Sequence, residues 1–143
     1  MDKEISLEKF IGTQEQISIL YELLKKRSYN ISHKKMPTIK EHKIFVQNNR
    51  YRDWYIVFYK GETIGSFYIK YDNSIGIKIS KQKTNIVKHI IDFIYSNFEP
   101  EESIPSEIPP YFYFNVSYDN KELKDCFKNI SLKPFQTSYK YES

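Results

Sequence analysis

The stretch WYIVFYKGETIGSFYIKYDNSIGIKIS, residues 54–80, decides the fold. It holds three apolar and aromatic runs, WYIVFY, TIGSFYIKY and SIGIKI. The runs are separated by Lys60-Gly61-Glu62 and by Asp72-Asn73, which are turn-forming residues at the spacing of β-hairpins. The stretch therefore predicts a three-stranded antiparallel meander.

A helix is predicted directly after the meander, from Asn85 to Phe98. Its apolar stripe repeats at helical spacing and consists of Ile86, Ile90, Phe93, Ile94 and Phe98. Ser80 to Thr84 join it to the last strand of the meander. A helix N-terminus at a strand end offers backbone N–H groups and the positive end of the helix dipole. This junction is therefore a predicted site for a phosphate-bearing ligand.

The N-terminal part is predicted to contain one short strand and two helices. Capping-box pairs, in which Thr is followed three residues later by Gln or Glu, mark both helix starts. The pairs are Thr13 with Gln16 and Thr38 with Glu41. The expected elements are a strand at 4–10, a helix at 14–27, a loop at 28–37 and a helix from 38 to about 48.

The C-terminal part is predicted to alternate between strands and a helix. Residues 99–110, EPEESIPSEIPP, form an expected exposed connector because proline and glutamate dominate them. YFYFNVS (111–117) predicts a strand too apolar for a sheet edge, and a helix follows from Asp119-Asn120 to about Ile130. KPFQTSYKYE (133–142) alternates as a final strand. The predicted order is β-α-α-β-β-β-α-β-α-β.

Composition favours one soluble cytoplasmic domain. The chain has 143 residues, of which 40% are hydrophobic, enough for one ordinary core. The net charge of +4 is dispersed, so no nucleic-acid partner is expected. No apolar run reaches the length of a membrane span, so no membrane partner is expected. Cys126 is the single cysteine, and the three histidines lack metal-ligand spacing, so no metal is predicted.

Several ordered motifs resemble a known superfamily. SHKKMP (32–37), HKIFV (42–46) and YRDWYI (51–56) are similar to an SHxxMP, HxxFV and YRxWYLI pattern of a bacterial branch. IGSFYI (64–69) and NSIGI (73–77) resemble its IGxxYL and NEIGI motifs. NVSYDNKELKDCF (115–127) resembles its NPxNxxSxxxF run, and PFQTSY (134–139) resembles its closing strand.

These motifs identify the chain as similar to the GCN5-related N-acetyltransferase (GNAT) superfamily. The resemblance covers nearly the whole chain. It implies an α/β (α+β) fold in a single domain over 1–143, with a mixed twisted sheet of about six strands and about four helices. It also implies an acyl-CoA-dependent N-acyltransferase that transfers acetyl from acetyl-CoA to a small primary amine. An amino sugar, either free or linked to a nucleotide, is the expected acceptor by family analogy alone.

The resemblance places the co-substrate between the meander and the helix that follows. Backbone N–H groups at Ile77, Lys78 and Ile79 are expected to meet the thioester carbonyl. The family's pyrophosphate loop, Gln/Arg-x-x-Gly-x-Gly/Ala, corresponds to Gln82, Lys83, Thr84, Asn85, Ile86 and Val87, with Lys88 next.

Two residues of that loop depart from the family pattern. Asn85 and Val87 stand where glycines are expected, and the branched Val87 side chain is expected to occupy space that a phosphate oxygen needs. Lys81, Lys83 and Lys88 are either replacement anion ligands or a plain solvated helix start. Both interpretations are open.

The residues expected to move protons also depart from the family. Ser74 replaces the glutamate of NEIGI, and Phe127 replaces the tyrosine that often protonates the thiolate. His33 is a candidate base because its pKa of ~6.5 suits proton removal, and Tyr118 is a candidate acid. His33 is alternatively a loop-bracing residue. Asn115 and Asn120 are expected at the cofactor, although Asn120 is equally a helix N-cap.

These departures leave a second function class open. A non-catalytic binding or assembly module would keep the fold and lose coenzyme A, and binding of coenzyme A separates the two classes. A homodimer through the final strand or the exposed sheet face is compatible with either class.

Overall fold

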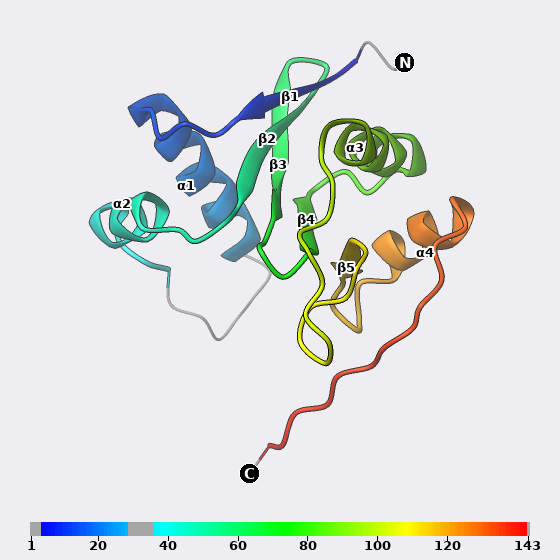
Figure 1. Ribbon diagram of the computed structural model, residues 1–143. Coiled ribbons are helices and arrows are strands. Elements are labelled where there is room, and N and C mark those ends of the chain that lie inside the picture. The colour runs from blue at the N-terminus through cyan, green and yellow to red at the C-terminus, as the bar shows by residue number, and fades with distance from the viewer. Residues whose placement is uncertain (1–3, 29–35, 143) are drawn as a thin grey trace.

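The computed structural model describes residues 4–28 and 36–142, and it forms one mixed sheet with helices on both faces (Figure 1). The order of elements is β1 (Ile5–Lys9), α1 (Gln14–Ser28), α2 (Ile39–Gln47), β2 (Asp53–Tyr59), β3 (Glu62–Ile69), β4 (Ser74–Ile79), α3 (Thr84–Asn97), β5 (Tyr113–Asn115) and α4 (Lys121–Asn129).

The predicted meander is confirmed as β2, β3 and β4. The spatial order of strands is β1-β2-β3-β4-β5, with antiparallel pairing at the first three junctions and parallel pairing between β4 and β5. Lys60 and Gly61 both have positive φ, 51° and 82°, which is the conformation of a tight hairpin turn. Asn73 has φ 70° in the second turn. The turn residues therefore adopt the conformations that their sequence favours.

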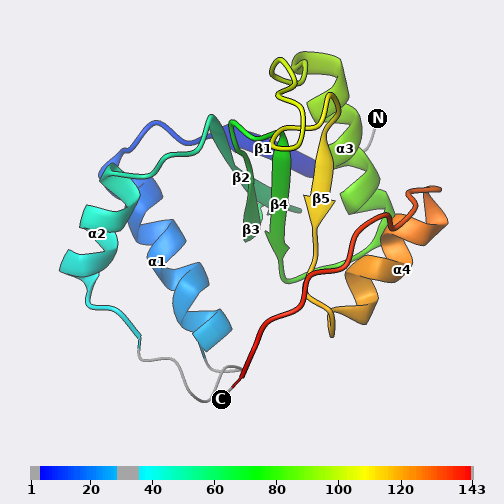
Figure 2. The ribbon, with the colours of Figure 1, turned by 60° about the horizontal axis from the view of Figure 1, so that its bottom comes forward.

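Helices cover the two faces of the sheet (Figure 2), and each face has its own hydrophobic core. On one face Ile75, Ile77 and Ile79 of β4 pack with Ile86, Ile90 and Ile94 of α3, and with Leu123 and Phe127 of α4. On the other face Trp54 and Ile56 pack with Ile17 and Leu20 of α1 and with Val46 of α2. The period-2 alternation of the strands separates the two sets.

In both predicted capping boxes the threonine side-chain oxygen accepts the expected hydrogen bond from the backbone N–H three residues later. Thr38 Oγ1 accepts from Glu41 N at 3.1 Å, and Glu41 Oε1 accepts from Thr38 N at 2.9 Å, which completes the box. Thr13 Oγ1 accepts from Gln16 N at 3.1 Å. The Gln16 side-chain oxygen instead accepts from Ile11 N and Gly12 N, at 2.8 and 3.1 Å.

Two predictions about the C-terminal part are wrong. The strand expected over 111–117 is confined to Tyr113–Asn115, and it lies at the edge of the sheet. The strand expected over 133–142 is not formed, so the described sheet has five strands. Alternation shows only that a segment is suited to pairing, whereas a strand also needs an adjacent edge with which to bond.

The burial of His42 should make the stability of the protein depend on pH. It is buried between α1 and α2, and its ring lies 5.2 Å from the ring of Tyr21. Burial lowers the pKa of His42 below its usual range, and a hydrogen bond to the Ile17 backbone opposes this only in part. The unfolded chain, with a histidine pKa of about 6.5, then binds a proton more readily than the folded chain does. The free energy of unfolding should therefore fall as the pH drops below about 6.5.

The melting temperature of the native protein and of His42→Phe, measured from pH 7.5 to 5.0, checks this expectation. The melting temperature of His42→Phe should fall less at acid pH than that of the native protein, whereas that of His89→Gln should fall as much. An unchanged pH profile in His42→Phe would contradict the assignment.

Candidate functional site

The parallel ladder between β4 and β5 is short, and the unpaired edge of β4 beyond it, which we call the opening, leads to α3. It consists of the pairs Ser74 with Tyr113, Ile75 with Phe114 and Gly76 with Asn115. β4 continues to Ile79, while β5 ends at Asn115. Residues 77–79 therefore lie beyond the ladder, and the chain passes from them through 80–83 into the N-terminus of α3 (Figure 2).

The peptide groups of β4 have a defined orientation at this opening. Lys70 N donates to Ser74 O at 2.9 Å and Ser80 N donates to Ile64 O at 2.8 Å, so even-numbered β4 residues bond toward β3. Odd-numbered residues then direct their N–H and C=O groups toward β5. Ile77 and Ile79 thus point their peptide groups to the opening, while the peptide group of Lys78 points toward β3.

The face of β4 opposite α3 is polar and partly covered by aromatic rings. Ser74, Gly76 and Lys78 alternate onto this face because the isoleucines occupy the other one. A Cβ atom at Gly76 would overlap the ring of Tyr68, so that ring lies directly over the glycine. Tyr68 in turn stacks on Tyr51, with centroids 4.1 Å apart and planes 4° from parallel. An aromatic wall therefore flanks the opening.

Ser74, a predicted catalytic residue, is held in a buried polar cluster. Only 2% of its surface is exposed, and its Oγ donates to Asp72 Oδ1 at 2.5 Å. Burial alone would raise the pKa of Asp72, but hydrogen bonds from Ser74 and the charge of Lys70 lower it overall. Burial and then the charge of Asp72 raise the pKa of Tyr113. The proton of the Ser74 hydroxyl is therefore used in the hydrogen bond to the Asp72 carboxylate.

Asn73, just before β4, links three segments by hydrogen bonds: the β3–β4 turn, the connector at 101–109, and β5. Its side-chain amide donates to Glu101 O at 3.0 Å and to Pro109 O at 2.9 Å, and Oδ1 accepts from Glu101 N at 2.6 Å. Its backbone carbonyl accepts from Tyr113 N at 3.1 Å. The side chain is fully buried. The sequence marks Asn73 only as a turn residue and motif match, because its long-range partners leave no local signal.

The predicted pyrophosphate loop connects β4, α3 and α4. Gln82 Nε2 donates to Ile79 O at 3.4 Å, and the buried Cys126 thiol donates to Gln82 O at 3.2 Å. Asn129 Nδ2 donates to Thr84 Oγ1 at 3.1 Å. Lys83 is the N-cap of α3 and makes no side-chain capping bond. The start of α3 is thus held in place by α4 and not by a cap of its own.

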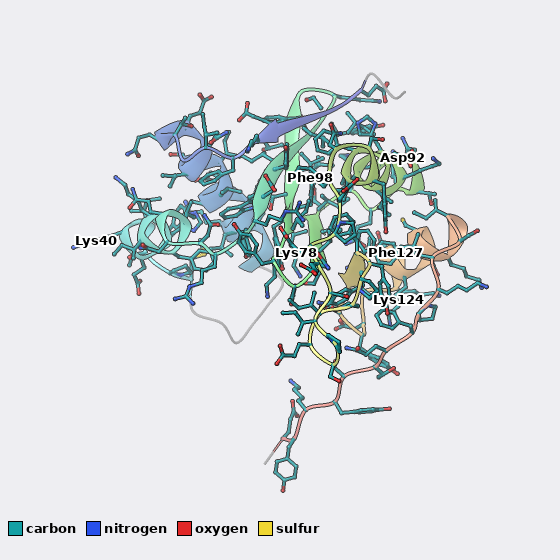
Figure 3. The ribbon with its side chains drawn as sticks, in the orientation of Figure 1. Lys40, Lys78, Asp92, Phe98, Lys124 and Phe127 are labelled. Atoms are coloured by element: carbon teal, nitrogen blue, oxygen red, sulfur yellow. The ribbon has the colours of Figure 1, made fainter. Side chains whose placement is uncertain are left out.

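The lysines near this helix start have different surroundings. Lys81 and Lys83 are exposed, and Lys83 Nζ lies 5.5 Å from the ring centroid of Tyr59. Lys88 pairs with Asp92 at 2.7 Å, one turn further along α3 (Figure 3). Lys81 and Lys83 are therefore better placed than Lys88 to meet an anion at the helix mouth.

The steric effect expected of Val87 is wrong. Its side chain is fully buried in the core that α3 shares with the sheet. Ile86 N and Val87 N both donate to Lys83 O, at 3.0 and 3.1 Å, so these amides belong to the helix. Position 87 shares a helix face with Ile90, Ile91 and Ile94, so its side chain packs into the core. Asn85, in the first turn, is exposed.

The remaining predicted residues lie on β5 and α4, or outside the described part. Asn120 is the N-cap of α4, and its Oδ1 accepts from Leu123 N at 3.2 Å. Phe127 is buried, with its ring 5.5 Å from that of Phe114 (Figure 3). Asn115 is exposed at the end of β5 and Tyr118 is 89% exposed. His33 lies outside the described residues.

Neither a group of metal ligands nor a membrane-length apolar helix occurs in the described part of the chain. Within 4–28 and 36–142, no three His, Cys, Asp or Glu side chains are grouped as metal ligands. None of the helices in these ranges combines the length and apolar character of a membrane span.

Solved structures share this fold. RimL, a ribosomal L7/L12 alpha-N-protein acetyltransferase in complex with coenzyme A, matches with a TM-score of 0.62 and 14% identity, over 91% of this chain and 80% of its own. An aminoglycoside acetyltransferase from an uncultured soil metagenomic sample, in complex with sisomicin, has a TM-score of 0.61 and 8% identity over 99% and 97%. A predicted acetyltransferase from Clostridium acetobutylicum, solved with acetyl-CoA, has a TM-score of 0.56 and 13% identity over 96% of each chain.

Comparison by sequence finds no such match. No protein-family profile matches this chain, and no curated protein sequence matches it. At these low identities the similarity to the solved structures shows the fold.

Proposed function

We propose that this chain, which has the fold of the GNAT acetyltransferases, is an N-acetyltransferase that uses acetyl-CoA. One observation carries the proposal. The β4–β5 ladder ends at Gly76 and Asn115, and the opening beyond it faces the uncapped N-terminus of α3. A thioester and a pyrophosphate need these two features side by side.

The described residues suit the co-substrate at each end. The N-terminal turn of α3, with Lys81 and Lys83 exposed beside it, would hold the pyrophosphate through backbone N–H groups and charge. Val87 does not obstruct this turn, because its side chain lies in the core. Acetyl-CoA would supply the activated acetyl group. The backbone N–H groups that Ile77 and Ile79 direct into the opening would donate to its carbonyl and polarise it.

The polar face of β4 is the proposed acceptor side. Tyr68 offers a ring wall over Gly76, and Lys78 and Asn115 are exposed next to it. Such a surface suits a small primary amine on a ring, such as an amino sugar. Two of the structurally similar proteins are aminoglycoside acetyltransferases, which supports this class of acceptor. Asp72 lies before the start of β4, away from residues 77–79, so water would take the proton from the acceptor's ammonium group.

A second candidate is a binding module that has no catalytic activity. It is favoured by the residues at two positions, 74 and 127, where the family has proton-transfer groups. The Ser74 hydroxyl donates a hydrogen bond to the Asp72 carboxylate, and Phe127 is a buried ring. Alignment of the reactants alone supplies a large part of the acceleration in acyl transfer, so the enzyme does not require either group.

Calorimetric titration with acetyl-CoA tests the proposal. The native protein is expected to bind with a Kd of micromolar order, about 8 kcal/mol. Lys81→Glu/Lys83→Glu should weaken binding by roughly tenfold or more, because the pyrophosphate would meet two negative charges. Lys40→Glu/Lys43→Glu changes the net charge equally on α2, far from α3 (Figure 3), and should bind as the native protein does.

Release of free thiol from acetyl-CoA, screened over aminoglycosides and simpler amino sugars, then separates the two candidates. Binding with turnover supports the enzyme, binding without turnover of any amine contradicts the transferase, and the absence of both supports the module that has lost coenzyme A. Absence of acetyl-CoA binding by the native protein would overturn both the co-substrate and the enzyme.

A further inference from the structure

A small pocket lies at the rim of the proposed acceptor side. Its volume is about 350 Å³, and it is formed by the end of α2, the loop that follows, and the first residue after β3. The residues that line it are Phe45, Asn48, Asn49, Arg50, Tyr51 and Lys70. This volume is within the range of pockets that bind small molecules.

Tyr51 connects this pocket with the polar face of β4. Its ring stacks on Tyr68 with centroids 4.1 Å apart, and the Tyr68 ring lies directly over Gly76. Tyr51 and Tyr68 both pack against the core that the sheet shares with α1 and α2. The helices α3 and α4 lie on the other side of the sheet (Figure 2). The pocket and the acceptor side therefore belong to the same face of the sheet.

The charged side chains of the pocket are all positive. Arg50 and Lys70 are exposed, and neither takes part in an ion pair within the described residues. The carboxylate that senses the charge of Lys70 is Asp72, whose Oδ1 already accepts from the Ser74 N–H and hydroxyl. Among the described residues that line the pocket, none is acidic. The pocket should therefore attract an anionic group and repel a polycation.

Side-chain amides cover the end of α2 and hold the loop after it. Asn48 Nδ2 donates to Ile44 O at 2.9 Å, and Asn49 Nδ2 donates to Val46 O at 2.8 Å. Asn49 Oδ1 accepts from Tyr51 N at 3.0 Å. These bonds satisfy carbonyl groups at the negative end of the helix dipole, which reduces their repulsion of an anion. They also fix the loop that presents the guanidinium group.

We propose that the acceptor is a primary amine that carries a phosphate group, and that Arg50 and Lys70 bind this group. The inference rests on the proposed transferase function and names its substrate class. A phosphate monoester has a charge of about −1.5 to −2 at pH 7, which two cations match, whereas a carboxylate has a single charge. The guanidinium group of Arg50 can bind two phosphate oxygens at once, and Lys70 adds a compact charge.

The spacing along the sheet suits a phosphorylated amino sugar. Lys70 N donates to Ser74 O at 2.9 Å, so Lys70 is level with the start of β4. Ile77, whose N–H faces the opening, is three residues further along β4, roughly 10 Å away at the rise of a strand. The long side chains of Arg50 and Lys70 can shorten this span, and one sugar ring between the amine and the phosphate would bridge it. The Phe45 ring, 58% exposed, offers a surface for the apolar face of that ring.

Calorimetric titration of the native protein with glucosamine 6-phosphate, and separately with glucosamine, tests the proposal without co-substrate. The phosphate ester is expected to bind at least tenfold more tightly than glucosamine. Arg50→Glu/Lys70→Glu should abolish this preference, because the phosphate would meet two negative charges. Arg50→Gln/Lys70→Gln, which adds no charge to the surface, should reduce the preference to less than threefold.

Two controls with the same change of net charge locate the effect. Lys121→Glu/Lys128→Glu alters exposed residues of α4, on the other face of the sheet, and should keep the preference. Lys81→Glu/Lys83→Glu should also keep it, whereas loss of the preference in this variant would place the sugar phosphate at the start of α3 and overturn the proposal.

The proposal is also overturned if the native protein binds both sugars equally, or binds neither at about 10 mM. A preference that survives Arg50→Glu/Lys70→Glu would overturn it as well. Acetyl-CoA titration and thiol release report separately on the proposed function. A phosphate preference without acetyl-CoA binding would contradict the transferase and keep the phosphate site. Turnover of unphosphorylated amino sugars without any preference would keep the transferase and contradict this acceptor.

Discussion

Val87→Gly is expected to reduce the free energy of unfolding by about 3 kcal/mol and to leave acetyl-CoA affinity without improvement. The family pattern has a small residue here, so the substitution would be the natural attempt to restore the loop. The fully buried Val87 side chain, however, contributes roughly 2 kcal/mol through burial of its methyl groups. Glycine inside a helix costs about 1 kcal/mol more. Denaturant unfolding and calorimetric titration measure the two quantities.

Asn85→Gly is the matched control for Val87→Gly. Asn85 occupies the other glycine position of the pattern, but it is exposed in the first turn of α3. Its replacement should cost less than about 1 kcal/mol. A clear gain in acetyl-CoA affinity on Val87→Gly, with little loss of stability, would show that Val87 does block the phosphate.

Asn73→Ala is expected to lower the free energy of unfolding by about 4 kcal/mol. It removes three buried hydrogen bonds to Glu101 and Pro109, each worth about 1 kcal/mol, and it leaves their backbone groups unsatisfied. Alanine at φ 70° adds about 1 kcal/mol of backbone cost. The backbone carbonyl of Asn73 also accepts a hydrogen bond from Tyr113 N, so movement of this turn should loosen β5 and weaken acetyl-CoA binding.

Asn73→Gly separates the two contributions. Glycine accepts the positive φ but makes none of the side-chain bonds. Its free energy of unfolding, measured by urea titration, should therefore exceed that of Asn73→Ala by about 1 kcal/mol. It should still be well below that of the native protein. Native-like stability of Asn73→Gly would show that the side-chain bonds contribute little.

Local patterns were sufficient for most of the elements. Hairpin turns at Lys60-Gly61 and Asp72-Asn73 specify the meander, and the Thr38 capping box specifies the start of α2. The isoleucine stripe of α3 predicted both the helix and the face that it buries. These features succeed because neighbouring residues determine them. The placement of the opening beside α3 also follows, since β4 leads directly into that helix.

Features that depend on distant partners were decided by the tertiary structure. The motif alignment placed Val87 at a phosphate, but helix periodicity and the opposing sheet direct it into the core. The buried Ser74 side chain hydrogen-bonds to Asp72, and the Asn73 side chain hydrogen-bonds to the connector next to β5.

The C-terminal segment shows the same division between local pattern and tertiary structure. The sequence by itself determined the meander, the helices and the alternating strand pattern of 133–142, because periodicity and turn chemistry lie within a few residues. Only the tertiary structure decided that β5 is an edge and that this last segment lies unpaired beside it. The reason is that a strand is completed by hydrogen bonds to a neighbour, and the neighbour's position is a property of the whole fold.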